Sequence, residues 1–251
     1  MENIRHPEGE VRIGVVGKYT QLLEAYKSLN EALTHGGIAN KYKVKIKWID
    51  SELLEKESVE SHLNDVSAIL VPGGFGQRGT EGKIAAIKYA REHKVPFLGI
   101  CLGMQLAVVE FARHVLDYSD ANSTEMDPQT THPVISLMEQ QKMQSGKGGN
   151  MRLGASPCLL KAGSLIQSVY QSDTVFERHR HRYEFNTDYK DAFEAKGMII
   201  SGQHPEYLLT ESVEISEHPW FIGVQYHPEF QSKPHQPNPL FVHFVQASLK
   251  R

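Results

Sequence analysis

The chain has 251 residues, 40% of them hydrophobic, which is enough to bury the core of one large α/β domain. Its 27 basic and 30 acidic residues give a net charge of -3, and this charge does not favour binding to nucleic acid or to an anionic membrane surface. Two cysteines exclude a disulfide framework, and neither a signal-like N-terminus nor an apolar run of about 18 residues is present. We expect one cytoplasmic domain, residues 1–251 with a core of about 11–245, that binds neither nucleic acid nor membrane.

The first half of the chain alternates short apolar runs with segments of helical period, the pattern of a parallel sheet covered by helices. Strands are predicted at 11–16, 42–49, 67–71 and 95–100. Helices are predicted at 21–33, with a stop at the glycines 36 and 37, and at 80–92.

The pattern changes from about residue 117. Residues 119–147 are rich in Asp, Ser, Thr, Pro and Gln, which favours a long irregular excursion. Partly antiparallel strands are predicted at 178–185, 198–202, 211–215 and 220–226, followed by a helix near 239–249. The expected fold is a three-layer α/β domain with a mostly parallel central sheet, helices on both faces and an additional partly antiparallel β region. Its site is expected at the carboxyl ends of the strands.

Cys101 lies where a predicted buried strand meets a predicted helix, with Gly99 and Gly103 two residues to either side. A sharp strand-to-helix turn holds its central side chain free of the backbone, in a strained conformation that flanking glycines accommodate. The start of the helix favours a thiolate and offers N–H groups to an oxyanion. The pattern predicts that Cys101 is a nucleophile. Cys158 has no such glycines and no helix directly after it, and is expected to be structural.

A glycine-rich loop follows the neighbouring predicted strand, with glycine at three of the four positions 73–76. Backbone N–H groups in such a loop can point into a site and stabilise the oxyanion of a tetrahedral intermediate. Glycines also suit an ordinary tight turn, so the loop gains its weight from lying one βα unit before Cys101. We expect the N–H groups of Gly74 and Leu102 to form the oxyanion hole.

The sequence His-Pro-Glu occurs twice, at 204–206 and at 227–229, each time after an apolar run. In an extended segment residues i and i+2 project the same way, so either copy could place a carboxylate beside an imidazole. A nucleophilic cysteine needs such a histidine, and the carboxylate fixes the tautomer of the imidazole. Spacing does not distinguish the two copies.

Three segments together resemble the motifs of a class I glutamine amidotransferase domain: 72–76, 99–105 and 223–230. Further segments are similar, more narrowly, to the glutaminase domain of the CTP synthase family. These are 17–20, 24–28, 78–80, 121–125, 151–154 and 177–184. The resemblance spans roughly residues 11–245. His204-Pro205-Glu206 departs from the family, which more often has an acidic, glycine-containing turn there.

The resemblance implies a role for each matching residue. Cys101 is the implied nucleophile, His227 its base and Glu229 the partner that orients the base, because the family uses the copy after Gly-Val-Gln-Tyr. Gly74 and Leu102 are the implied contacts to the oxyanion. The glutamine-binding residues implied by the match are Gly74, Phe75, Leu102, Gly103, Met104, Gln105, Glu125 and Arg182. Glu125 suits the α-ammonium group of glutamine, and the Arg182 guanidinium suits its α-carboxylate.

The resemblance also implies the reaction. L-glutamine is hydrolysed to glutamate and ammonia through a γ-glutamyl thioester, and a synthetase domain, in the same chain or a separate one, uses the ammonia to convert UTP to CTP with ATP and Mg²⁺. No part of these 251 residues resembles that domain, so the N-terminal synthetase domain is expected to be absent. Two alternatives stay open: a subunit that serves another synthetase, and a noncatalytic regulatory module of the same fold.

No cofactor or metal is expected in this chain. The 13 histidines include His179 and His181 in one alternating segment, but none shows a ligand spacing typical of a metal site. Arginines at 178, 180 and 182 stand beside these two histidines and favour anion binding instead.

Overall fold

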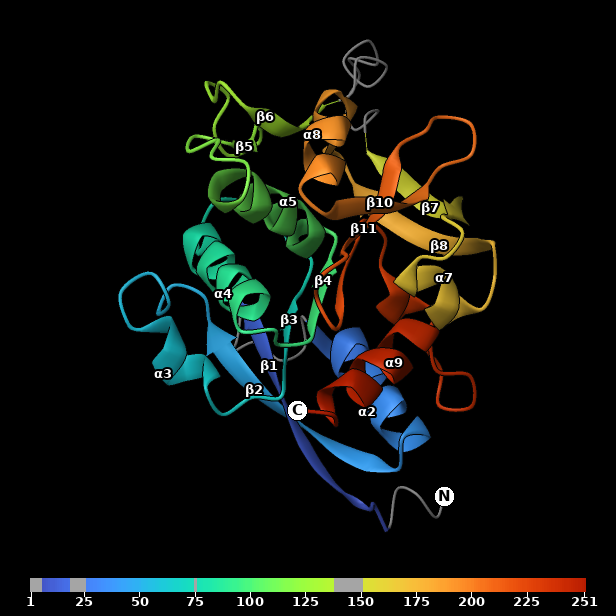
Figure 1. Cartoon of the computed structure of the whole chain (residues 1–251). Helices are drawn as coiled ribbons and strands as arrows, with labels where there is room; N and C mark the ends of the chain where they lie inside the picture. The colour runs from blue at the N-terminus through green and yellow to red at the C-terminus, as the bar shows by residue number, and fades with distance from the viewer. Residues whose placement is uncertain (1–5, 19–25, 75, 138–150) are drawn as a thin grey trace.

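A nine-stranded sheet runs through the part of the chain that the computed structural model describes, residues 6–18, 26–74, 76–137 and 151–251 (Figure 1). In spatial order its strands are β2 (Tyr42–Asp50), β1 (Gly9–Gly17), β3 (Ala68–Val71), β4 (Phe97–Ile100), β12 (Phe221–Val224), β11 (Thr210–Ile215), β10 (Met198–Gln203), β7 (Arg152–Leu160) and β8 (Thr174–His181). Neighbouring strands are parallel from β2 to β12 and antiparallel from β12 to β8. The predicted fold class is confirmed.

Helices cover both faces of this sheet, because apolar residues on each face gather into a separate core cluster. One cluster packs α3 (Val59–Leu63), α4 (Thr80–Glu92), α5 (Leu102–His114) and α8 (Lys190–Ala195). The other packs α2 (Lys27–Ala39), α7 (Leu165–Tyr170) and α9 (Pro239–Ser248). Figure 1 shows α4 and α5 side by side, and α2 beside α9. The helix predicted at 80–92 has the bounds of α4, and the one predicted near 239–249 is α9.

A second, three-stranded sheet forms from β5 (Asn122–Ser123), β6 (Pro133–Ser136) and β9 (Glu184–Phe185). Residues 119–137 are therefore not wholly irregular, and residues 138–147 of the predicted excursion lie outside the described residues. The single strand predicted at 178–185 is wrong, because β8 ends at His181 and β9 pairs with β6 in the other sheet. Short 3-10 turns follow at Thr187–Tyr189 and Pro228–Phe230.

Strand β7 was not predicted, because Gly154 and Pro157 interrupt its apolar pattern. Proline lacks an N–H and is tolerated in a strand where one edge is unpaired. β7 pairs with β8 along its length but with β10 only at Leu159 and Leu160, so Pro157 lies in the half with one unpaired edge. Tertiary pairing thus accommodates a residue that reads locally as a strand breaker.

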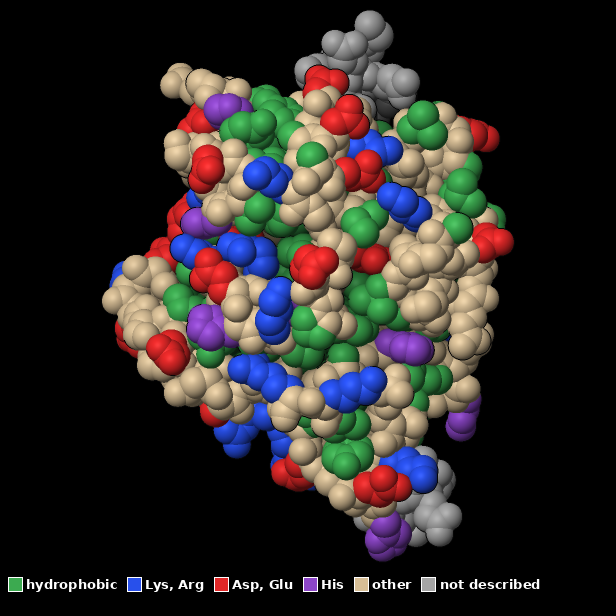
Figure 2. Space-filling view, viewed as in Figure 1, with side chains coloured by type: hydrophobic (Ala, Val, Ile, Leu, Met, Phe, Trp, Pro, Cys, Tyr) green, Lys and Arg blue, Asp and Glu red, His purple; other side chains and the backbone are tan. Residues whose placement is uncertain are grey.

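Lys and Arg side chains are interspersed with Asp and Glu over the face shown in Figure 2.

Large apolar side chains are exposed on the outer face of β7 and β8, where Leu153, Leu159 and Phe176 are 67%, 50% and 64% accessible. Among the residues that the structure describes, no helix is long and apolar enough to cross a membrane.

Gly36 and Gly37 lie inside α2, so the predicted helix stop at these glycines is wrong. Residues 21–25 of the predicted helix lie outside the described residues. A Cβ added at Gly36 would come within 2.6 Å of the Phe241 carbonyl oxygen on α9, and one at Gly37 within 2.7 Å of the Tyr42 carbonyl oxygen. The glycines therefore allow close packing of α2 against α9 and β2.

Gly36→Ala should destabilise the protein. Alanine at an unobstructed position inside a helix stabilises by about 0.5–1 kcal/mol relative to glycine, but overpacking costs about 1–3 kcal/mol. We expect a lower free energy of unfolding in urea. Asn30→Ala, an exposed change in the same helix, is the control and should be neutral or slightly stabilising. A stabilised Gly36→Ala variant would contradict the packing.

Candidate active site

Cys101 occupies the turn between β4 and α5 in a backbone conformation that side chains rarely adopt, with φ 52° and ψ -104°. Its N–H donates to the Val224 carbonyl of β12 at 2.7 Å, which fixes the turn on the neighbouring strand. Leu102, directly after it, is the first residue of α5, where a helix leaves its N–H groups without intrahelical partners. The structure therefore has the strained strand-to-helix turn that the sequence predicts.

The glycines around Cys101 allow close contact between backbones. A Cβ at Gly103 would lie 2.0 Å from the Val71 carbonyl oxygen, so α5 can approach β3 only with glycine there. A Cβ at Gly73 would lie 2.7 Å from Cε1 of His227 and 3.5 Å from Cβ of Cys101. Glycine at 73 thus leaves room for the imidazole beside the cysteine.

His227 follows β12, the strand that pairs with β4 in parallel. Its Nδ1 lies 2.7 Å from Oε1 of Glu229, which leaves Nε2 for the sulfur of Cys101. Burial would lower the pKa of His227, but hydrogen bonds and charge from Cys101 and Glu229 outweigh burial and raise that pKa to about 10. The site favours an imidazolium beside the sulfur, an arrangement that stabilises a thiolate.

His204 serves its own turn. Its Nδ1 accepts the N–H groups of Glu206 and Tyr207, each at 3.2 Å, and its ring stacks on that of Tyr207. Because this ring nitrogen already accepts hydrogen bonds from two backbone N–H groups, its interactions are made within the turn and not with Cys101. Of the two histidines that spacing alone left undistinguished, the structure places His227 beside Cys101, the copy that the family resemblance implies.

Two cavities meet at Cys101 and Gly74. One, of about 350 Å³, is lined by Gly74, Cys101, Gln105, Glu125, Met151, His181, Arg182 and Tyr183. The other, of about 250 Å³, is lined by Tyr26, Lys27, Ser28, Leu29, Pro72, Gly73, Gly74, Cys101, Arg180, His227, Glu229 and Phe230. Cys101 thus borders both cavities, and the first cavity carries the carboxylate of Glu125 and the guanidinium of Arg182.

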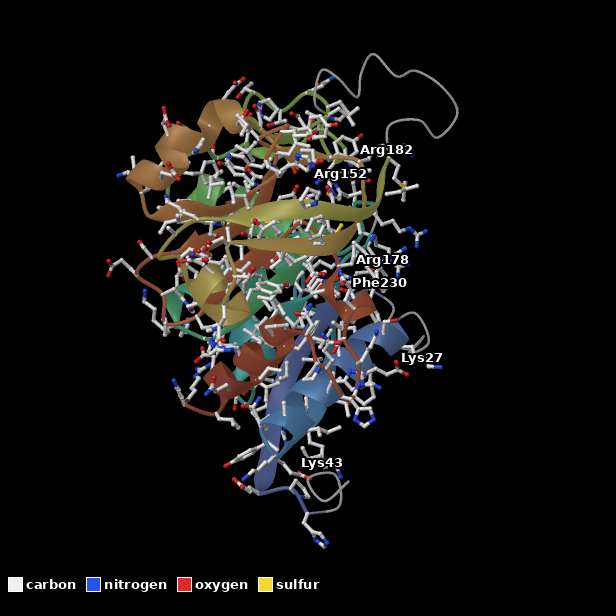
Figure 3. The ribbon with its side chains drawn as sticks, turned by 90° about the vertical axis from the view of Figure 1, so that its right-hand side faces the viewer. Lys27, Lys43, Arg152, Arg178, Arg182 and Phe230 are labelled. Carbon is white, nitrogen blue, oxygen red and sulfur yellow. The ribbon has the colours of Figure 1, made fainter. Side chains whose placement is uncertain are left out.

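The first cavity is lined by four of the eight residues predicted to hold glutamine: Gly74, Gln105, Glu125 and Arg182. Burial raises the pKa of Glu125, opposed by a hydrogen bond from the Gly76 backbone and by the charges of Arg182 and Lys18. Arg182 is exposed and lies just past the end of β8, at the edge of the molecule in Figure 3. Phe75 lies outside the described residues.

Leu102, Gly103 and Met104 do not line either cavity. Met104 is fully buried in the core beside Gly223, and Gly103 is covered by β3. Their predicted contact with glutamine stays a prediction. Gln225, whose Nε2 lies 3.7 Å from Sγ of Cys101, is a site residue that was not predicted. The available signal was a glutamine at the end of an otherwise apolar strand.

Strand β8 points its histidines inward and its arginines outward. His179 and His181 are buried, and burial lowers their pKa to about 2 and about 3, so both are neutral. Across residues 6–18, 26–74, 76–137 and 151–251, no group of three or more His, Cys, Asp or Glu is arranged to hold a metal ion. The inward histidines therefore belong to the polar core behind the first cavity.

Residues 21–247 match the family model described as glutamine amidotransferase class-I. CTP synthases of Pelobacter propionicus and Carboxydothermus hydrogenoformans are 57% and 54% identical over 250 residues, covering 99% and 100% of this chain. The chain spans about half, 47%, of the length of these relatives. The glutaminase domain of a Trypanosoma brucei CTPS, solved with acivicin bound, is 39% identical with a TM-score of 0.91, over 96% of this chain and 94% of that one.

Cys101→Ala should lower the pKa of His227, because it removes the hydrogen bond and charge of the sulfur while burial remains. In the unsubstituted protein, the His227 imidazolium persists as pH rises above the ordinary pKa of 6.5, and it is lost as pH passes through about 10. NMR titration of labelled imidazoles measures this, with His227→Gln assigning the resonance. Cys158→Ala is the control and should leave the titration of His227 unchanged. Titration at the same pH in Cys101→Ala would show that the sulfur does not hold the proton on His227.

Proposed function

Since the chain belongs to the class I glutamine amidotransferase family, we propose that it hydrolyses L-glutamine to glutamate and ammonia as the glutaminase part of a CTP synthase. The observation that carries this proposal is the meeting of Cys101, His227 and Glu229 beside a cavity with a carboxylate and a guanidinium. The bound acivicin of the trypanosomal domain is consistent with a site of this kind.

The proposed reaction begins when the Cys101 thiolate attacks the side-chain amide carbon of glutamine. The C–S bond forms as the carbonyl electron pair moves to oxygen, and the N–H groups of Gly74 and Leu102 receive that oxyanion. His227 donates its Nε2 proton to the departing nitrogen, so that the C–N bond breaks and ammonia leaves. A γ-glutamyl thioester remains on Cys101.

Water completes the proposed cycle. Neutral His227 accepts a proton from water as its oxygen attacks the thioester carbon, and collapse of the second tetrahedral intermediate expels the Cys101 thiolate. Glutamate leaves and the imidazolium is restored. Glu229 holds Nδ1 throughout, so that Nε2 always faces the reacting atoms.

Substrate recognition follows from the charges of the first cavity. We propose that Glu125 binds the α-ammonium group of glutamine and Arg182 its α-carboxylate, with Gln105 and Gly74 as further contacts in the same cavity. Phe75 stays in the proposed set from the family resemblance. Gly103 and Met104 complete the proposed set through their backbone at the start of α5. Each charged contact is remote from the reacting amide and orients it toward Cys101.

The proposed partner is a synthetase domain, in the same chain or a separate one, that uses ammonia, ATP and Mg²⁺ to convert UTP to CTP. The second cavity also borders Cys101, and its lining includes Lys27, Arg180 and Phe230. Arg178, Phe230 and Lys27 lie along one edge of the molecule (Figure 3). We propose that ammonia leaves on this side toward the synthetase domain. No cofactor is proposed for the glutaminase reaction itself.

We propose a cytoplasmic location. Cys101 and Cys158 are both free and buried rather than paired in a disulfide. Burial raises the pKa of the Cys158 thiol far above its usual range, which keeps it neutral and unreactive. The nucleophile needs a reduced sulfur, which a reducing compartment maintains.

His227→Ala should reduce glutamine hydrolysis at least about 100-fold, because it removes the proposed acid and base. His204→Ala should retain most of the activity, since its ring serves only its own turn. Glutamate release by the two purified variants measures this, with circular dichroism confirming that both are folded. Equal losses would mean that the proposed base is wrongly assigned. If neither the unsubstituted chain nor its complex with a synthetase hydrolysed glutamine, the chain would be better explained as a noncatalytic module.

The 251-residue chain should form no CTP from UTP, ATP, Mg²⁺ and ammonia, because ammonia bypasses the glutaminase site and the amination site is proposed to lie elsewhere. A full-length CTP synthase under the same conditions is the positive control. CTP formed by the chain, free of contaminating synthase, would contradict the proposed division of activities. If only a different synthetase used the ammonia that this chain releases, the chain would be identified as a subunit of that enzyme.

A further inference from the structure

Gln225 is a fully buried amide in contact with the nucleophile. It directly follows β12, and its backbone N–H donates to the Glu211 carbonyl of β11 at 2.8 Å. Its side-chain Nε2 lies 3.7 Å from Sγ of Cys101, and its Oε1 lies 3.1 Å from Nε2 of Gln105. The contact therefore connects the sulfur with a residue that lines the first cavity.

The orientation of both amides follows from their partners, independently of how the oxygen and nitrogen atoms are assigned. A carbonyl can only accept, so the atom of Gln105 that lies 2.9 Å from the Tyr183 carbonyl oxygen must be its NH₂ group. The second hydrogen of this NH₂ group points to Gln225, so the atom that receives it must be the oxygen of Gln225. The NH₂ group of Gln225 consequently faces the sulfur.

A donor aimed at sulfur distinguishes its two protonation states. A thiolate accepts from Gln225 and from protonated His227, whereas a neutral thiol donates and finds an acceptor in the Arg180 carbonyl oxygen, 4.0 Å away. Hydrogen bonds to a charged group are stronger than those to a neutral one. The contact with Gln225 therefore favours the charged sulfur.

We propose that Gln225 is a positioning residue that holds Cys101 as a thiolate, and that Gln105 sets its orientation. This inference rests on the proposed function and adds a member to its site. Gln105 then has two functions, since one amide borders the substrate cavity and orders the donor to the nucleophile. A molecule that binds in the first cavity and contacts Gln105 would therefore affect the protonation state of the Cys101 sulfur.

Titratable groups face Cys101 from several elements. These are His227 and Glu229 after β12, Arg180 and His181 on β8, Arg182 and Tyr183 after β8, Glu125 after β5, Tyr26 before α2, and Lys27 on α2. Gln225 and Gln105 are uncharged at every pH. A change in the pH profile of the sulfur after their substitution therefore reports the hydrogen bonds and not the loss of a titrating group.

The experiment measures alkylation of native Cys101 by iodoacetamide from pH 5 to pH 10, followed by peptide mapping. Iodoacetamide needs no glutamine site, so Gln105 can affect the rate only through the sulfur and its neighbours. In Gln225→Met we expect the midpoint of the profile to move to higher pH by about one unit, the effect of losing about 1.4 kcal/mol, so that alkylation is about tenfold slower at pH values below the midpoint.

Gln105→Met should slow alkylation in the same direction, and the double variant should equal Gln225→Met, because the two residues act in series. Gln203→Met, a change outside the site, is the matched control and should leave the profile unchanged. An additive double variant would overturn the role of Gln105, and an unchanged profile in folded Gln225→Met would overturn the proposal. Should Gln225→Met not fold, Gln105→Met alone decides, since an unchanged rate there contradicts the relay.

Glutamine hydrolysis is measured separately on the same proteins. If the unsubstituted protein hydrolyses no glutamine but the alkylation rates follow the expected order, the proposed function is overturned and the contact between Gln225 and Cys101 is still supported. If hydrolysis is present and alkylation does not depend on Gln225, the proposed function stands and the relay is overturned.

Discussion

The parallel pairing of β4 with β12 is the constraint on which the site depends. Gly99 pairs with Gly223 and Ile100 with Val224, and the next N–H, that of Cys101, donates to the Val224 carbonyl. This register places Gln225 level with the nucleophile and His227 two residues beyond it. A shift of one residue would turn the side chains that follow β12 to opposite faces.

Strain at the nucleophile is maintained by packing on all sides. The φ of 52° at Cys101 is costly for a residue with a side chain, by about 1–3 kcal/mol, and persists only where the surroundings determine it. Here α5 lies so close to β3 that Gly103 admits no Cβ without a clash, and the ring of His227 lies so close to Gly73 that a Cβ there would clash as well. Packing of the sheet thereby holds the side chain of Cys101, which is only 4% exposed, at the border of the two cavities.

A buried polar cluster supports the wall of the first cavity. Arg152 is hydrogen-bonded to Glu211, and its Nη1 lies 3.7 Å from Oε1 of Glu184. Burial raises the pKa of Glu211 to about 7, although Arg152 opposes the shift, and burial also raises the pKa of Glu184. One guanidinium cannot neutralise two buried carboxylates, so the cluster holds a proton near neutral pH. His181 joins the cluster to the cavity that it lines.

The sequence by itself determined the features that are local. Apolar runs and glycine spacing located β3, β4, α4 and the turn at Cys101, because these depend on residues close together in the chain. Residue spacing did not distinguish His227 from His204, since both stand in the same tripeptide, and only the family resemblance selected His227. Only the pairing of β12 with β4 brought one of them to Cys101, while the other caps its own turn. The same holds for Gly36, which reads as a helix stop until α9 packs against it, and for Gln225, whose neighbours come from distant segments. Contacts between segments far apart in the chain are set by the sheet as a whole, and no local pattern contains them.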